Sequence, residues 1–162
     1  MKIVYINGFK GEASNKPIEF AKLLETEIEH IKFIVNPDGT TNVDEVTKLA
    51  KDADLIIASS TGGYIAIEIA YNFNIPLITT NAITNYDMLL ETFKKLDHKI
   101  DLPDYRNVII AHLSLVNADD ELIEHDLNIL GEVVVFNKGG HRFTNLEETI
   151  PYIKDFMNRN II

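Results

Sequence analysis

The hydrophobic residues of this chain occur in short runs that alternate with stretches of helical periodicity. Six runs rich in isoleucine, valine and leucine predict strands at Lys2–Asn7, Ile31–Asn36, Asp54–Ser59, Pro76–Asn81, Asn107–Leu113 and Glu132–Asn137. The other stretches predict helices at about Pro17–His30, Val43–Asp52, Gly62–Asn72, Tyr86–Leu96, Glu121–Leu130 and Leu146–Asn158. Strand and helix are thus expected to alternate along the whole chain.

Two features of this pattern define the expected fold. Strand segments such as Leu55–Ile57 and Val133–Val135 are apolar throughout, which is typical of parallel strands covered on both faces. A chain of 162 residues without internal repeats or linkers has the length of one domain. We therefore expect a single α/β domain over residues 1–162, with about six mostly parallel strands and helices on both faces of the sheet.

Two predicted helices begin with a capping-box pattern. In such a box, the first side chain accepts a hydrogen bond from a free amide, and an acidic residue three positions later reaches back. The pairs are Asn42 with Glu45 and Thr144 with Glu147. They are expected to fix the starts of the second and last helices.

The composition excludes several classes of chemistry and partner. Without cysteine, the chain has no thiol nucleophile, no thiolate metal ligand and no disulfide. A formal net charge of -10 opposes binding to nucleic acid or to an anionic membrane surface. The first strand begins without a leader pattern before it, and no apolar run is long enough to span a bilayer, so we expect a cytoplasmic protein.

The most informative segment is Asp54–Gly63, where an apolar strand leads through a serine pair directly into a mostly apolar helix. This is the layout of a nucleophile elbow, a turn so sharp that only small residues fit two positions before and after the nucleophile. Ala58 and Gly62 occupy those positions for Ser60, whereas an isoleucine and a threonine would occupy them for Ser59. Ser60 is therefore the better candidate. The alternative is an ordinary strand-to-helix turn, or one that binds phosphate at the helix start.

A serine nucleophile needs a base, and five histidines compete for that role. His141 follows two glycines directly after the last strand, at the sheet edge where ligands bind in this fold class, and is the predicted base. His112 lies inside a predicted strand and is interpreted as a hydrogen-bonded structural residue. The remaining three are interpreted as solvated surface residues: His30, His98 and His125.

The acid and the oxyanion donors are sought at the same edge. Asp119 and Asp120 both follow the fifth strand, and either could orient the histidine while the other caps the next helix. The order serine, acid, histidine is that of α/β-hydrolases. The backbone N–H groups of Thr61 and Phe9 are the expected oxyanion donors, since Gly8 lets the loop before Phe9 approach closely.

Six segments, spread over almost the whole chain, carry a family resemblance. They are Lys2–Phe9, Ser14 with Lys16, Ala58–Tyr64, Pro76 with Thr80–Ala82, Asp119–Leu122 and Gly139–Phe143. In order and spacing they resemble the small bacterial YqiA-type esterases of the α/β-hydrolase superfamily. The resemblance implies a compact α/β-hydrolase fold, a triad of Ser60, Asp120 and His141, and an oxyanion hole formed by the amides of Phe9 and Thr61.

These observations predict a carboxylic ester hydrolase that forms an acyl-enzyme and needs neither cofactor nor metal. Its partner would be a small acyl ester or thioester, without nucleic acid or membrane, and the protein would be a monomer or homodimer. Only residues 83–106 could form a small cap over the site, so short acyl chains are expected to react best. The acyl pocket is expected to involve Asn7, Tyr86, Met88 and Phe93, although a helix that packs the last three on the sheet is the common alternative.

Two other functions remain open. A fold can outlast its chemistry, so the chain could be a catalytically silent α/β-hydrolase-fold protein that acts as a binding module. It could also bind a nucleotide or phosphate at the helix that follows Ser60. The second possibility is weaker, because the chain lacks G-x-G-x-x-G and a Walker-type lysine, and because it leaves His141 without a role.

Overall fold

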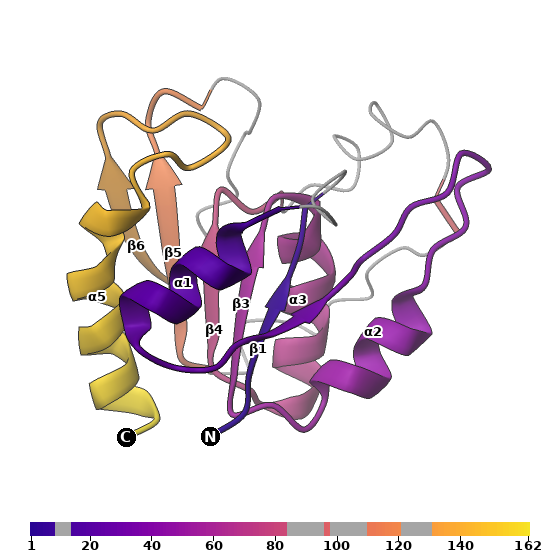
Figure 1. Ribbon diagram of the computed structural model, residues 1–162. Coiled ribbons are helices and arrows are strands. Elements are labelled where there is room, and N and C mark those ends of the chain that lie inside the picture. Colours follow the sequence, from indigo (N-terminus) through magenta and orange to yellow (C-terminus); the bar gives the residue numbers. More distant parts are fainter. Residues whose placement is uncertain (9–13, 84–95, 98–109, 121–130) are drawn as a thin grey trace.

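The computed structural model describes residues 1–8, 14–83, 96–97, 110–120 and 131–162 (Figure 1). Its centre is a six-stranded sheet with the order β2-β1-β3-β4-β5-β6, in which every neighbouring pair is parallel. The strands are β1 (Ile3–Ile6), β2 (Glu29–Ile31), β3 (Leu55–Ser59), β4 (Leu77–Thr80), β5 (His112–Asn117) and β6 (Glu132–Phe136). The predicted parallel α/β sheet is thereby confirmed.

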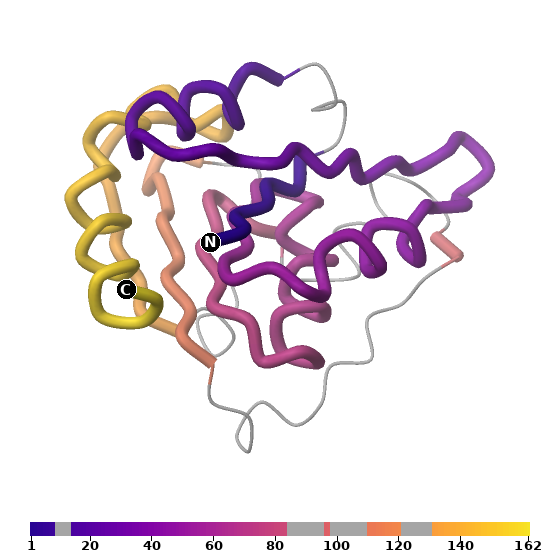
Figure 2. The backbone as a smooth tube through the Cα atoms, turned by 60° about the horizontal axis from the view of Figure 1, so that its bottom comes forward, coloured from indigo at the N-terminus to yellow at the C-terminus, as the bar shows by residue number. Residues whose placement is uncertain are grey.

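Helices cover both faces of this sheet (Figures 1 and 2). The described helices are α1 (Lys16–Leu24), α2 (Val43–Ala50), α3 (Thr61–Phe73) and α5 (Leu146–Asn160). One apolar core lies between the sheet and α2 and α3, and a second lies between the sheet and α1 and α5. Alternate residues of one strand serve the two cores: Val4 and Ile6 of β1 face the first, and Ile3 and Tyr5 face the second.

The strand order fixes where a ligand can approach. From β1 the chain crosses to β2 on one side and then to β3 on the other, so the order reverses between β1 and β3. In open parallel sheets, ligands bind beyond the carboxyl ends of the strands at such a reversal. Gly8 follows β1 and Ser60 follows β3, which brings the predicted nucleophile to this point.

The second strand lies earlier than predicted and is shorter. It spans Glu29–Ile31, so His30 belongs to a strand and does not end a helix. Beyond it, side-chain amides replace the strand ladder: Asn7 bonds with both the N–H and the C=O of Phe33. Asn42 accepts from the N–H of Ile34 and donates to the neighbouring carbonyl of Lys32. Buried and exposed side chains still alternate as in a strand, but the backbone N–H and C=O groups are hydrogen-bonded to side chains.

The expected capping boxes do not form. The side-chain oxygen of Asn42 accepts from the N–H of Ile34, so this side chain makes no cap bond to the first turn of α2. The last helix starts one residue later than its box requires, with Asn145 as the N-cap, while the Thr144 hydroxyl donates to the carbonyl of Gly139. The first helix ends at Leu24, several residues before its predicted end.

The fifth strand was also misplaced. It spans His112–Asn117, whereas the predicted strand is Asn107–Leu113, and the added part includes the polar residues Ser114 and Asn117. Both are buried, and the Ser114 hydroxyl is bonded to Thr79 and His112. His112 is therefore a buried, hydrogen-bonded residue, as predicted.

Some expected elements fall outside the described residues. The predicted helix Glu121–Leu130 does so entirely, as does Tyr86–Leu96 apart from its last residue. Among the helices that the structure describes, none combines the length and apolar character needed to cross a bilayer.

Candidate active site

Ser60 occupies a sharp junction between β3 and α3. Its backbone has φ 50° and ψ -123°, a conformation that costs a non-glycine residue about 1–3 kcal/mol. Three backbone bonds hold it there: its N–H donates to Thr80, and its carbonyl accepts from the amides of Gly63 and Ile83. This strained, fixed turn is what the elbow pattern predicted.

Close approach of neighbouring chain segments explains the small residues at the elbow. A methyl group added to Gly62 would lie 2.2 Å from the carbonyl oxygen of Asn7 at the end of β1. One added to Gly8 would lie 2.9 Å from the Cβ of Ser60 itself. The loop after β1 therefore reaches the nucleophile candidate only because both positions are glycine.

The structure brings three predicted side chains into one hydrogen-bonded chain. The Ser60 Oγ lies 3.0 Å from Nε2 of His141, and Nδ1 of the same ring lies 3.0 Å from Oδ2 of Asp120. The Asp120 carboxylate has no solvent exposure, whereas 30% of the His141 side chain is exposed. Such a geometry favours the tautomer with the proton on Nδ1, which leaves Nε2 free to accept the serine proton.

Asp119 has a different environment from Asp120. Its two carboxylate oxygens accept hydrogen bonds from the backbone N–H groups of Gly139 and Gly140, at 3.3 and 2.9 Å. The bond from Gly140, followed by that from Gly139, lowers the pKa of this carboxyl. Asp119 thus holds the loop that carries His141, while Asp120 contacts the ring.

Three asparagines support the same loop: Asn81 directly after β4, Asn117 at the end of β5, and Asn145, the N-cap of α5. Asn81 and Asn117 both donate to the carbonyl of Gly140, and the Asn81 side chain also accepts from the Asn117 backbone. Asn145 donates to the Asn117 side-chain oxygen. Asn81 and Asn117 are fully buried, so this network fixes the position of the histidine loop.

Ser59 is bound away from the triad. Its hydroxyl lies 2.7 Å from the Tyr5 hydroxyl and 2.7 Å from that of Thr80, and all three groups are buried. Burial raises the pKa of Tyr5 to about 12, partly offset by the bond to Ser59. The two adjacent serines are therefore distinct: Ser59 lies within a buried hydroxyl chain, and Ser60 contacts the histidine.

No family model and no curated protein matches the sequence. Among solved structures, a carboxylesterase from the ammonia-oxidizing thaumarchaeon Nitrososphaera gargenis is similar, with a TM-score of 0.63 and 15% identity over 97% of this chain and 89% of the other. The fold is that of an α/β-hydrolase.

Oxyanion donors in an α/β-hydrolase fold come from the residue after the nucleophile and from the loop after an adjacent strand. Thr61 is buried and is the first residue of α3, whose first N–H groups have no partner within the helix. Phe9, the second predicted donor, lies outside the described residues.

A cavity of about 840 Å³ opens beside Ser60 and His141. Its described lining comes from β1, the loop after β1, α1, the elbow and the histidine loop: Tyr5, Gly8, Ser14, Asn15, Lys16, Glu19, Ser59, Ser60, His141, Arg142, Phe143, Thr144 and Leu146. Asn7 is not among these residues; its amide is buried and bonds to backbone atoms of Gly8 and Phe33. The other three predicted pocket residues, Tyr86, Met88 and Phe93, lie outside the described part of the chain.

Sequence reasoning missed several contributors to this site. The roles of Asn81 and Asn145 depend on loop geometry, although Asn81 directly follows a strand end, which is the signal that could have identified it. Tyr5 looked like an ordinary strand residue. Lys16 belongs to the segments that carry the family resemblance, and no local pattern predicts that the start of α1 lies on the same cavity as the elbow.

Proposed function

We propose that this α/β-hydrolase-fold protein is a serine carboxylic ester hydrolase. The single observation that carries the proposal is the continuous hydrogen-bonded chain from Ser60 through His141 to a fully buried Asp120 carboxylate. The likeness in fold to a carboxylesterase and the strained elbow at Ser60 support it. From the six segments that resemble the YqiA-type esterases, we further propose that it belongs to that family.

In the proposed first half-reaction, the Ser60 Oγ attacks the ester carbonyl carbon. His141 Nε2 accepts the hydroxyl proton as the new C–O bond forms, and later delivers it to the departing alkoxide. Asp120 accepts the Nδ1–H bond and stabilises the positive charge that develops on the ring. Because the Asp120 carboxylate is shielded from water, this stabilisation is stronger than at an exposed site.

The negative charge that develops on the carbonyl oxygen requires fixed donors. The Thr61 amide is the first of α3, where an N–H has no acceptor within the helix and lies at the positive end of the helix dipole. We propose the Phe9 amide as the second donor. In the second half-reaction, His141 removes a proton from water, which attacks the acyl-enzyme and regenerates Ser60.

The proposed substrates are esters or thioesters with short acyl chains. A panel of 4-nitrophenyl esters of graded acyl length tests both the activity and the size preference. We expect the highest kcat/KM for the short acyl chains, and a loss of turnover on the order of 10⁴-fold or more in Ser60→Ala. Undiminished activity in that variant would exclude Ser60 as the nucleophile, and a marked preference for long chains would contradict the size prediction.

The alternative of a catalytically silent binding module makes the opposite prediction. Such a protein would hydrolyse no member of the panel above the rate in buffer. Because Ser60→Ala removes only one hydroxyl, circular dichroism of the variant should match that of the parent, which separates lost chemistry from lost folding.

A further inference from the structure

The described lining of the cavity beside Ser60 has a net charge opposite to that of the molecule. The protein has 25 acidic and 15 basic residues, yet the described lining of the cavity includes two cations, Lys16 and Arg142, and one acid, Glu19. The Asp120 carboxylate is enclosed and does not line the cavity. A wall of this composition attracts anions against the repulsion of the whole molecule.

Lys16 is a partly buried cation that has no ion-pair partner among the described residues. Within the described residues no carboxylate lies within 4 Å of its ammonium, and its nitrogen lies 5.9 Å from the centroid of the Phe143 ring. Desolvation lowers its pKa to about 8, although Glu19 opposes that shift. A partly buried ammonium without an ion-pair partner costs folding energy, and an anionic ligand would recover it.

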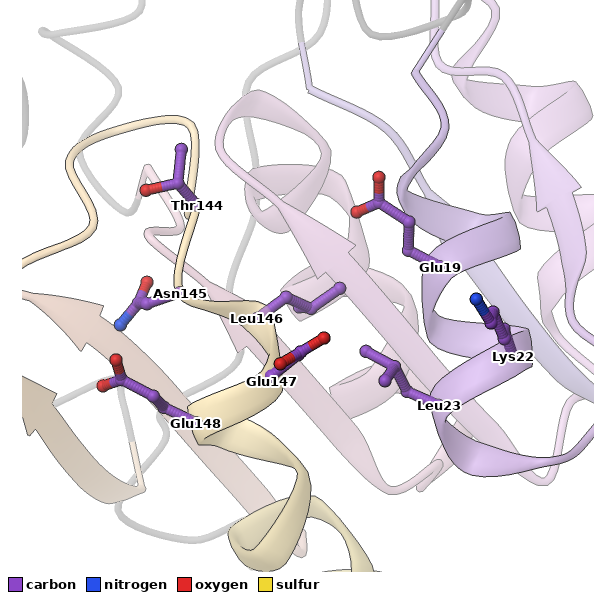
Figure 3. Close-up of a pocket in the computed structure, with 8 residues that line it drawn as sticks. All are labelled: Glu19, Lys22, Leu23, Thr144, Asn145, Leu146, Glu147 and Glu148. Carbon is purple, nitrogen blue, oxygen red and sulfur yellow. The ribbon is translucent and has the colours of Figure 1, made fainter.

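The surroundings of Lys16 limit where an anion can sit. Ser14, Asn15 and Lys16 bring the N-terminal turn of α1 to the cavity, and Arg142 follows His141 on the opposite loop. The adjoining pocket of about 470 Å³ between α1 and α5 has three acids, Glu19, Glu147 and Glu148, and one lysine (Figure 3). Its charge repels anions, so the Lys16 side of the site is favoured.

We propose that Lys16, assisted by Arg142, binds an anionic group on the substrate, so that the preferred substrates are small esters that carry a carboxylate or phosphate away from the scissile bond. This rests on the proposed esterase function and specifies its substrate class. Lys16 is a binding and specificity-determining residue and takes no part in the covalent steps.

Two pairs of esters test the proposal, one for each side of the scissile bond. The first pair is 4-acetoxybenzoate and the neutral 4-acetoxybenzamide; the second is mono-(4-nitrophenyl) adipate and 4-nitrophenyl hexanoate. For at least one pair, we expect kcat/KM to favour the anionic ester, and the preference to fall roughly tenfold in Lys16→Met. Lys16→Arg should restore it, and Lys22→Met, on the exposed side of the same helix, should leave it unchanged.

The pH dependence of this preference adds a second readout. As pH rises from 7 to 9, Lys16 loses its charge, so the preference should fall in the parent protein and stay flat in Lys16→Arg. Among the described residues, the other charged or titratable groups on the same cavity are Glu19, Tyr5, His141 and Arg142. Titration of the catalytic groups changes kcat/KM by the same factor for both esters of a pair, so it cancels in the ratio of the two values.

Failure of this inference is distinguishable from failure of the esterase proposal. If the parent hydrolyses the neutral esters through Ser60 but shows no preference in either pair, the anion site is wrong and the esterase stands. If no ester is hydrolysed, calorimetry with the unreactive analogues 4-acetamidobenzoate and 4-acetamidobenzamide decides. Tighter binding of the carboxylate that depends on Lys16 supports the site, and equal or absent binding of the two overturns it.

Discussion

Two adjacent serines with the same side chain have different environments in this protein. The Ser59 hydroxyl is buried and bonded to those of Tyr5 and Thr80, while the Ser60 hydroxyl contacts the His141 ring. The difference arises from strand geometry: successive residues of β3 point to opposite sides, and the elbow then turns Ser60 out of the sheet. Stability should therefore depend on the first serine and chemistry on the second.

Ser59→Ala leaves the buried Tyr5 hydroxyl without its partner, so we expect the free energy of unfolding to fall by about 1–3 kcal/mol. Urea denaturation measures this loss. Turnover should stay within about tenfold of the parent, since the triad is untouched. Ser60→Ala is the matched control and should show the reverse: near-normal stability and no measurable turnover. Equal losses of activity in the two variants would contradict the assignment.

The adjacent aspartates provide a second pair of matched variants. Asp120→Asn keeps the shape but loses the charge that orients His141, and we expect kcat to fall by about 10³ to 10⁴-fold. Asp119→Asn should lower kcat much less, because its side-chain oxygen can still accept one of the two hydrogen bonds from the backbone N–H groups of Gly139 and Gly140. Steady-state kinetics with one neutral ester measures both. If kcat fell further in Asp119→Asn than in Asp120→Asn, Asp119 would be the acid that orients His141.

The contact between α3 and β1 sets how tightly the elbow can close. Gly62→Ala places a methyl group against the backbone of Ile6 and Asn7, and backbone cannot yield as a flexible side chain can. We expect a loss of about 1–3 kcal/mol in unfolding free energy and a displaced Ser60. Gly140→Ala is the comparison, since that position has φ 59° but open space around it, so only conformational strain of about 1–2 kcal/mol is added. Thermal denaturation and activity assays of the two variants measure these effects.

If Gly62→Ala is as active and stable as the parent, the close approach of α3 to β1 is not what shapes the elbow. A loss confined to activity would indicate that the helix shifts while the fold persists.

The sequence predicted the elements best where local pattern and tertiary environment agree. The central strands and α3 are continuous apolar runs, so their parallel direction and burial followed directly. Prediction failed where side chains replaced backbone partners. The Asn7 and Asn42 amides end β2 early, and a buried Ser114 extends β5 past its apolar part, and neither effect has a periodic signal.

The same distinction applies to the candidate site. Strand ends in a parallel sheet meet at one edge, so the sequence places Ser60, His141 and an acidic pair there. It does not separate Asp119 from Asp120; only the family resemblance implies Asp120. The asparagines that hold the histidine loop, and Lys16 at the start of α1, depend on how loops and a helix pack across that edge. Distances of this kind are set by the folded chain and not by spacing along it.

At the scale of the whole molecule, the positive charge of Lys16 lowers the free energy of unfolding. Its pKa falls from 10.5 to about 8 on folding, so the unfolded chain binds the proton more tightly and the charged form disfavours folding. We expect Lys16→Met to raise the unfolding free energy by about 1–2 kcal/mol at pH 7. This gain should be fully present below pH 8 and disappear as pH rises toward 10.5, because parent Lys16 is then neutral in both states.

Urea denaturation of the parent and Lys16→Met across that pH range measures the difference. The titration of Tyr5, whose pKa is about 12, is common to both proteins and cancels. A destabilised Lys16→Met at pH 7 would mean that the ammonium has a stabilising partner. Stability lost through a residue that improves substrate binding is the trade expected at a functional site.

The most direct measurement is the site of covalent modification by a fluorophosphonate, read by intact mass and peptide mapping. A serine activated by His141 should become phosphonylated at Ser60 alone, with no adduct in Ser60→Ala and much slower labelling in His141→Gln. An adduct on Ser59 or on another residue, or labelling that is independent of His141, would contradict the proposed catalytic machinery.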